Sequence, residues 1–215
     1  MSPRRYNEVA AFILAGGQSS RMGRDKAWLE LAGVPLVVRI AHAVEPLVST
    51  VTVVGPPERF KSAGLTAIPD RISKSDTSAE LRLGPLGAIV TALNASECRW
   101  NLMLACDLPY LSTQWLDWLL QQATASPAQV VMPERIGGVE PLAAVYRKEC
   151  AAVLSAALAR EVRKVSDALS GLRVTVIAET EWRPLDPDGR VLANMNTPEE
   201  YAQARKWWEE VEGRG

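Results

Sequence analysis

The chain has 215 residues, of which 47% are apolar and 23% are charged, a composition typical of globular proteins and unlike that of disordered or collagen-like chains. The 24 Lys and Arg residues nearly balance the 25 Asp and Glu residues, which argues against nucleic acid or an anionic membrane as a partner. This length predicts one domain over residues 1–215, with a core that needs no disulfides or structural metal. No apolar run approaches the ~18 residues of a membrane-spanning helix, so we expect a cytoplasmic protein.

The cysteine and histidine content narrows the chemistry further. Cys98, Cys106 and Cys150 are odd in number and widely spaced, which fits neither a disulfide framework nor a zinc motif and suits a reducing cytosol. His42 is the only histidine, and we expect a packing or surface role for it within a predicted helix. Catalytic triads and metal sites that need several histidines are therefore excluded.

Apolar runs alternate with helical patterns along the whole chain. The first run, Val9–Leu14, is continuous, as expected for a strand buried on both faces, and a polar loop follows it. The other expected elements are a helix at Leu36–Leu47 that begins near Pro35, strands at Val51–Val54 and Thr66–Ile68, a helix at Pro85–Ala95, a strand at Asn101–Ala105, a helix from the N-cap Ser112 to Ala125, strands at Val130–Met132 and Leu142–Tyr146 joined through a Gly137-Gly138 turn, a helix at Glu149–Ala159, a strand at Val174–Ile177 and a helix at Pro198–Val211. This alternation predicts an α/β fold with three layers and a mostly parallel, doubly wound sheet. Ligands bind such sheets beyond the carboxyl ends of the strands.

The loop after the first strand has the sharpest functional pattern. It reads LAGGQSSRMGRDK from Leu14 to Lys26. Adjacent glycines allow backbone N–H groups to face an anion, and Arg21, Arg24 and Lys26 add positive charge. The spacing fits neither a P-loop nor a G-x-G-x-x-G dinucleotide motif. The loop therefore indicates phosphate binding, and the alternative is a solvated loop with incidental charge.

This loop is similar to the signature loop of the nucleotidyltransferases that activate the molybdenum cofactor and sugar phosphates. Within that superfamily the chain most resembles the molybdenum cofactor guanylyltransferase family. The other motifs that carry the resemblance are Gly84-Pro85-Leu86-Gly87, Cys106-Asp107-Leu108-Pro109, Glu140-Pro141-Leu142 and Asn194-Met195-Asn196-Thr197-Pro198-Glu199-Glu200. The resemblance implies a Rossmann-like nucleotidyltransferase fold. It also implies transfer of GMP from GTP to the terminal phosphate of molybdopterin or the molybdenum cofactor, with release of pyrophosphate.

The resemblance also implies roles for individual residues. Arg21, Lys26 and Asp107 would be catalytic, with Mg²⁺ or Mn²⁺ bound at Asp107 because hard oxygen ligands suit these ions. Asn194 and Asn196 would bind the acceptor substrate. The implied nucleotide-binding residues are Leu14, Ala15, Gly16, Gly17, Lys26, Asp70, Gly84, Pro85 and Asp107. The attacking phosphate oxygen is already an anion, so the reaction needs no protein base.

Several positions keep a second interpretation. Asp107 and Asp70 could each be a turn residue, and Asn194 or Asn196 could cap the last helix. The family often has a polar residue near the guanine where this chain has Val54-Gly55-Pro56, so base recognition would have to use backbone groups there or the loop around Gly84. Residues 71–83 carry no motif that indicates a function.

Two alternatives to the guanylyltransferase hypothesis remain. One is a molybdenum cofactor cytidylyltransferase or another NTP transferase of the same superfamily, although the cytidylyl branch usually reads Ala-Ala-Gly where this chain has Ala15-Gly16-Gly17. The other is a catalytically idle homologue that binds nucleotide or pterin. Expected partners are GTP, the pterin acceptor and other proteins of cofactor biosynthesis or molybdoenzymes, with the chain itself a monomer or weak oligomer. The tryptophans at 115, 118, 207 and 208 could form a pterin platform or a docking face, or simply pack in the core.

Overall fold

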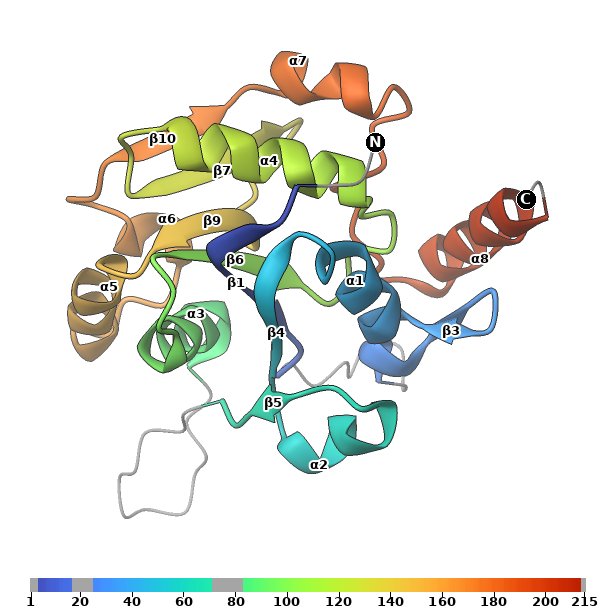
Figure 1. The fold of residues 1–215 in the computed structure, drawn as a ribbon, viewed down its shortest axis with the longest axis horizontal. Helices are drawn as coiled ribbons and strands as arrows, with labels where there is room; N and C mark the ends of the chain where they lie inside the picture. The colour runs from blue at the N-terminus through green and yellow to red at the C-terminus, as the bar shows by residue number, and fades with distance from the viewer. Residues whose placement is uncertain (1–3, 17–24, 71–82, 214–215) are drawn as a thin grey trace.

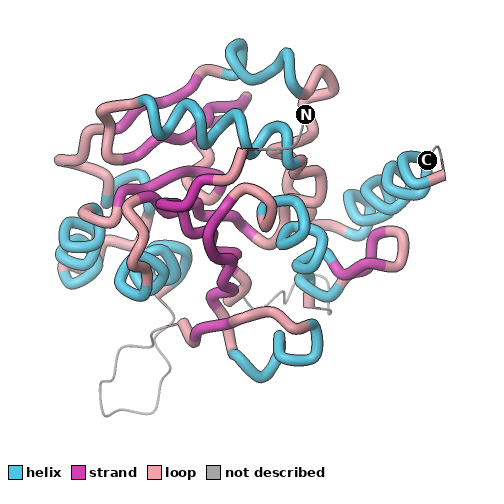
Figure 2. Tube along the Cα trace, in the orientation of Figure 1, coloured by secondary structure: helices cyan, strands magenta, loops and turns pink. Residues whose placement is uncertain are grey.

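The computed structural model describes residues 4–16, 25–70 and 83–213. A twisted sheet runs through the middle of the molecule and helices cover both of its faces (Figure 1). Strands and helices alternate along most of the chain, as the tube in Figure 2 shows. The predicted three-layer α/β architecture is confirmed.

The sheet is mostly parallel, as expected, but two of its described strands run in the opposite direction. Within the described residues its order is β10-β7-β9-β6-β1-β4-β5, and β8 pairs with β7. β1 is parallel to β4 and β6, β4 to β5, and β7 to β10. The strand bounds are β1 Tyr6–Leu14, β4 Val48–Val54, β5 Ala67–Ile68, β6 Trp100–Ala105, β7 Val130–Arg135, β8 Gly138–Val139, β9 Ala143–Arg147 and β10 Val174–Ile177.

β9 lies antiparallel to both of its neighbours, β6 and β7. The sequence predicts this strand but not its direction. Only residues 136–142 separate β7 from β9, and a parallel return would need a crossover of a dozen or more residues. Gly137 and Gly138 have φ angles of 108° and 127°, a region that favours glycine, so the predicted turn there is confirmed.

The two faces of the sheet are covered by different helices. Val9, Ala11 and Ile13 of β1 pack with the α1 and α4 side, whereas Ala10 and Phe12 pack with the α3 and α5 side. Successive residues of a strand point to opposite faces, so the apolar run of β1 supplies both cores. The helix bounds are α1 Leu36–Val44, α2 Pro57–Phe60, α3 Gly84–Ala95, α4 Thr113–Ala125, α5 Cys150–Ala159, α6 Val165–Ala168, α7 Glu179–Trp182 and α8 Pro198–Glu212.

The region between residues 25 and 48 differs from the expectation in two places. A short hairpin, β2 (Glu30–Leu31) with β3 (Val34–Pro35), precedes α1 where only a loop was expected. Its turn residues, Ala32 and Gly33, both have positive φ, as tight hairpins require. α1 ends at Val44 rather than Leu47, because Pro46 has no N–H to continue the helix, and β4 then begins at Val48.

No helix in the three described ranges is both long and apolar enough to cross a membrane.

The start of α4 provides a test of local stabilisation. Ser112 is its N-cap, as predicted, and its hydroxyl accepts a hydrogen bond from the Trp115 N–H at 3.2 Å. Ser112→Ala should lower the free energy of unfolding by about 1 kcal/mol, the usual cost of losing such a cap. Chemical denaturation measures this change. Ser112→Asp keeps an acceptor and should remain near wild type; an equal loss in both variants would contradict the capping role.

Candidate active site

The ends of four neighbouring strands meet at one edge of the sheet. The Ala15 N–H donates to the Val54 carbonyl at 3.0 Å, and the Gly55 N–H donates to the Ile68 carbonyl at 2.9 Å. On the other side of β1, the Cys106 N–H donates to the Leu14 carbonyl at 3.3 Å. The residues that follow β1, β4, β5 and β6 therefore lie together, at the edge where open α/β sheets bind ligands.

A lysine, a carboxylate and an amide from three distant segments meet at this edge. Lys26 Nζ donates a hydrogen bond to Asn196 Oδ1 at 2.6 Å and lies 3.8 Å from Asp107 Oδ2. Lys26 begins a short 3-10 helix, Lys26–Trp28, whose N-cap is Asp25. The Lys26 and Asp107 side chains are only 13% and 25% exposed. The structure thus brings together three of the residues predicted for the site.

The environment of Asp107 disfavours its charged form. Burial raises the pKa of this carboxyl above its usual value of 3.8, and the Lys26 ammonium partly opposes that rise. The carboxylate of Glu200 raises the pKa further. Lys26 offsets only part of the cost of burying the ionised carboxylate. A second cation nearby would therefore stabilise the ionised form.

The donor set around Asp107 suits a metal that is shared with a substrate. No group of three or more His, Cys, Asp or Glu residues that could hold a metal occurs in the part of the chain that the structure describes. Mg²⁺, however, usually takes one or two protein carboxylates and completes its shell with water and phosphate oxygens. The carboxylate of Asp107 and the amide oxygen of Asn196 both approach Lys26 and are hard oxygen donors, so these residues fit such an ion.

Cys106 directly precedes this carboxylate, and its surroundings disfavour the thiolate form. Burial, with the charge of Asp107 beside it, raises the pKa of the Cys106 thiol to about 12. The thiolate is the reactive form of cysteine, and this thiol remains protonated at neutral pH.

Asp70 lies on the far side of β1 from Asp107. The Thr91 hydroxyl of α3 donates to Asp70 Oδ1 at 3.4 Å. A Cβ placed on Gly16 would lie 3.1 Å from Asp70 Oδ2, so glycine allows this carboxylate to approach the backbone that follows β1. The structure therefore places Asp70 and Gly16 together.

Gly84 and Pro85 form the first turn of α3. Gly84 has a φ of 65°, and Pro85 occupies an early helical position that needs no N–H donor. α3 leads into β6, which is parallel to β1, so its N-terminus faces the carboxyl edge of the sheet. The free N–H groups at a helix N-terminus attract anions.

The segment before α8 is fixed by a capping box. The Thr197 hydroxyl accepts from the Glu200 N–H at 3.2 Å, and Glu200 Oε2 accepts from the N–H groups of Asn196 at 2.5 Å and Thr197 at 2.9 Å. Thr197 is therefore the cap, and the alternative that Asn194 or Asn196 caps this helix is wrong. The Met195 N–H donates to the Asp107 carbonyl at 2.9 Å, which joins this segment to the end of β6. Asn194 lies in the same segment, but the contact with Lys26 comes from Asn196.

Thr197 and Glu200 were not singled out in the sequence analysis as residues that shape the site. The T-x-x-E spacing of the closing motif is the signal that would have identified them. Gly17 and Arg21, in contrast, lie outside the described residues, so the structure does not place these two predicted site residues.

The aromatic residues and His42 have mainly packing or surface positions. Trp115 is fully buried and contacts Trp182 edge to face, and Trp208 is partly buried against the core. His42 is exposed, in agreement with the expected surface role.

The chain matches known proteins over most of its length. Residues 11–176 match the family described as the MobA-like NTP transferase domain. A probable molybdenum cofactor guanylyltransferase from Natronomonas pharaonis is 34% identical over 206 residues, which cover 93% of this chain and 98% of the relative. A probable molybdenum cofactor guanylyltransferase from Trichormus variabilis is 33% identical and covers 91% of this chain, with 90% of the relative matched.

Solved structures share the fold. Molybdopterin-guanine dinucleotide biosynthesis protein A from Archaeoglobus fulgidus has a TM-score of 0.78 at 22% identity, covering 94% of this chain and 99% of that chain. The 2-C-methyl-D-erythritol 4-phosphate cytidylyltransferase from Thermus thermophilus has a TM-score of 0.67 at 14% identity. The match covers 94% of this chain and 98% of that chain. Both have the Rossmann-like nucleotidyltransferase fold that the sequence resemblance implied. The match over residues 11–176, together with the relatives' coverage, shows that this chain belongs to the MobA-like NTP transferase family of nucleotidyltransferases.

Proposed function

We propose that this protein transfers GMP from GTP to the terminal phosphate of molybdopterin or the molybdenum cofactor and releases pyrophosphate. The observation that carries the proposal is the cluster of Lys26, Asp107 and Asn196 at the carboxyl edge of the sheet. The names of the relatives, molybdenum cofactor guanylyltransferase, support the choice of substrates.

The chemistry explains why this cluster suffices without a general base. A phosphate oxygen of the acceptor attacks the α-phosphorus of GTP, the bond from that phosphorus to the bridging oxygen breaks, and pyrophosphate leaves with the electron pair. The attacking oxygen is already an anion, so no proton has to be removed. Charge repulsion and alignment remain, and fixed cations and backbone N–H donors overcome both.

Each part of the site has a role in this reaction. Lys26, together with Arg21, would neutralise the triphosphate, while Asp107, with Asn196 as a second oxygen donor, would hold Mg²⁺ or Mn²⁺. When bound, the ion would supply positive charge to the phosphate oxygens. Asn194 and Asn196 would contact the acceptor phosphate.

The nucleotide would bind on the β1, β4 and β5 side of the cluster. Backbone groups of the β1 end and the N-terminal turn of α3 would contact the nucleotide, and Asp70 would lie near it. The residues of these two backbone regions are Leu14, Ala15, Gly16, Gly17, Gly84 and Pro85. All three cysteines of the chain are free thiols, which is compatible with a reducing cytoplasm as the place of the reaction. Cofactor-biosynthesis proteins or molybdoenzymes would receive the product.

The experiment that tests the function supplies GTP, CTP, ATP or UTP with Mg²⁺ and molybdopterin and follows pyrophosphate. We expect GTP to be preferred, because Ala15-Gly16-Gly17 matches the guanylyl branch. Equal or better use of CTP would contradict the guanylyl assignment. If none of the four nucleotides gives pyrophosphate although the protein still binds GTP, the protein would be a homologue that only binds its ligands.

Removal of the Lys26 charge should slow the reaction without unfolding the protein. Lys26→Met keeps the length of the side chain and removes its ammonium, so turnover should fall by about 10²–10³, the scale on which one preorganised charge contributes. Steady-state kinetics and circular dichroism measure the two effects. Lys206→Met, on the exposed surface of α8 where the lysine is 80% exposed, is the matched control. A folded Lys26→Met variant with near wild-type turnover would refute the assigned role.

Asp107→Asn should separate function from stability. Because burial raises the pKa of Asp107, this group favours folding below its usual pKa of 3.8, and the benefit is lost as pH rises and the carboxyl ionises. At pH 7 the neutral amide should therefore leave the melting temperature unchanged or slightly higher, while turnover falls by about 10²–10³. Excess Mg²⁺ or Mn²⁺ should recover part of this loss. An unstable variant that is fully active per folded molecule would make Asp107 a turn residue only.

A further inference from the structure

The segment that directly precedes the C-terminal helix α8 contacts both charged residues of the site. Asn196 Oδ1 accepts from Lys26 Nζ at 2.6 Å, and the Met195 N–H donates to the Asp107 carbonyl at 2.9 Å. Glu200, in the first turn of α8, fixes the backbone of Asn196. The position of α8 and the position of these polar groups are therefore linked.

α8 is held to the rest of the protein by few contacts. Ala204 is its only fully buried residue, and Tyr201 and Trp208 are partly buried against the core. The Tyr201 hydroxyl donates to the Glu30 carbonyl at 3.0 Å, and Trp208 Nε1 donates to the Pro109 carbonyl at 2.9 Å. The helix thus bridges the hairpin that follows Lys26 and the turn that follows Asp107 (Figure 1).

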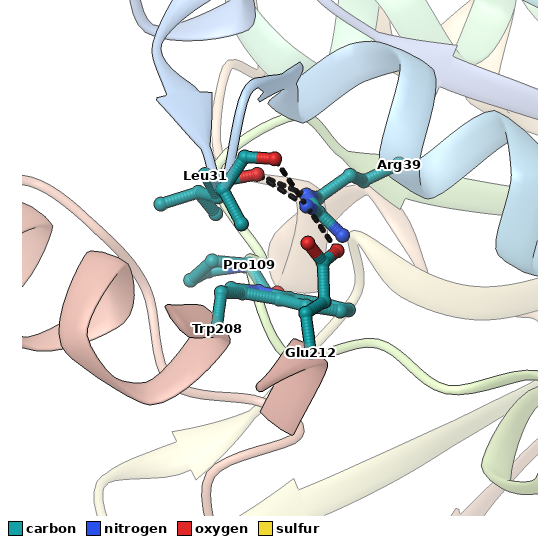
Figure 3. A network of polar contacts seen from close by, with 6 residues as sticks. Leu31, Arg39, Pro109, Trp208 and Glu212 are labelled. Atoms are coloured by element: carbon teal, nitrogen blue, oxygen red, sulfur yellow. Dashed lines mark hydrogen bonds and ion pairs between the residues drawn. The ribbon is translucent and has the colours of Figure 1, made fainter. Parts of the chain in front are cut away.

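Arg39 connects the far end of this helix to the same hairpin. Its Nε donates to the Leu31 carbonyl at 2.7 Å, and its Nη2 lies 2.7 Å from Glu212 Oε1. Its guanidinium carbon lies 3.9 Å from the centre of the Trp208 ring. Figure 3 shows Arg39 directed at Leu31 and Glu212, with Trp208 next to Pro109. We call Arg39, Trp208 and Glu212 the clasp.

The clasp joins a desolvated arginine to a carboxylate at the surface, because the Glu212 side chain is 47% exposed. The Arg39 side chain is only 10% exposed, and it combines a charged pair, two backbone acceptors and an aromatic face. A guanidinium stays charged at all physiological pH values and holds several acceptors in one plane. Contacts of this kind to a partly desolvated arginine are stronger than those of an exposed ion pair.

We propose that the clasp is a positioning device for the active site: it keeps α8 docked so that Asn196 stays on Lys26 and Met195 on Asp107. Only the effect on GTP binding and turnover rests on the proposed function; the docking of α8 does not. When the clasp is lost, α8 spends part of its time undocked, and only the docked fraction has the Lys26 geometry that binds the triphosphate. The apparent dissociation constant for GTP then rises in inverse proportion to that fraction. Saturating GTP restores the docked state, because coupling between two equilibria is reciprocal.

The test compares Arg39→Ala with wild type by hydrogen exchange and by binding. Without nucleotide, the variant should exchange at least about 10-fold faster in residues 198–213 and also in residues 25–31, which contain Lys26. The dissociation constant for GTP with Mg²⁺ should rise about 10-fold, while kcat stays within about twofold of wild type. GTP should restore protection to α8.

Matched variants keep the test decisive if Arg39→Ala fails to fold. Glu212→Gln removes the charge that faces Arg39, whereas Glu210→Gln removes a charge two residues away whose partner, Lys206, lies at 4.0 Å and is 80% exposed. Trp208→Phe keeps an aromatic ring under Arg39 but removes the donor to the Pro109 carbonyl. The Glu212 and Trp208 variants should shift exchange and GTP binding in the same direction as Arg39→Ala, and Glu210→Gln should not.

The outcomes separate the clasp from the proposed function. Faster exchange confined to α8, with unchanged residues 25–31 and unchanged GTP binding, would overturn the positioning role and leave the clasp purely structural. If wild-type protein fails to use GTP in the nucleotide panel, the function fails. Faster exchange at residues 25–31 without nucleotide would still support the clasp in that case.

Discussion

The ammonium of Lys26 is the interaction on which the arrangement of the site depends. It lies between an amide oxygen of Asn196 and the carboxylate of Asp107, and both partners are fixed by the backbone around them. Without a cation at this point, two oxygen-bearing groups would face each other in a partly buried position, which is unfavourable. In the proposed function the same charge would face the triphosphate, so the group that orders the site in the free protein would also bind the anionic ligand.

The site is built from long-range contacts. Its three side chains are separated by up to 170 residues in sequence, and no local element contains two of them. The parallel pairing of β1 with β6 brings residue 107 beside the end of β1, but residue 196 arrives only when the C-terminal helix docks. Contacts of such long range close large loops, at a cost in chain entropy.

Local patterns predicted most of the fold and part of the site. The apolar runs at residues 9–14 and 101–105 indicated buried strands, Ser112 indicated a cap, and the loop motif indicated the ligand edge; these features depend on neighbouring residues. The direction of β9 was not predictable from its composition, because it follows from the short connection after β7. The contacts of Arg39 were equally inaccessible, since a guanidinium that pairs with a carboxylate 173 residues away leaves no local trace. The roles of Gly17 and Arg21 remain predictions from the sequence.

The environment at the end of β6 acts on two neighbouring groups with opposite chemical results. Burial raises the pKa of both Cys106 and Asp107. For the carboxyl the rise is opposed by Lys26, and a further positive charge would stabilise the ionised form. For the thiol, a pKa of about 12 leaves roughly one molecule in 10⁵ as thiolate at pH 7, because each pKa unit is a factor of ten. Thiolate is the nucleophile that attacks peroxides and disulfides. The same buried position therefore keeps the sulfur of Cys106 in its less reactive, protonated form beside a carboxylate that a further cation would stabilise.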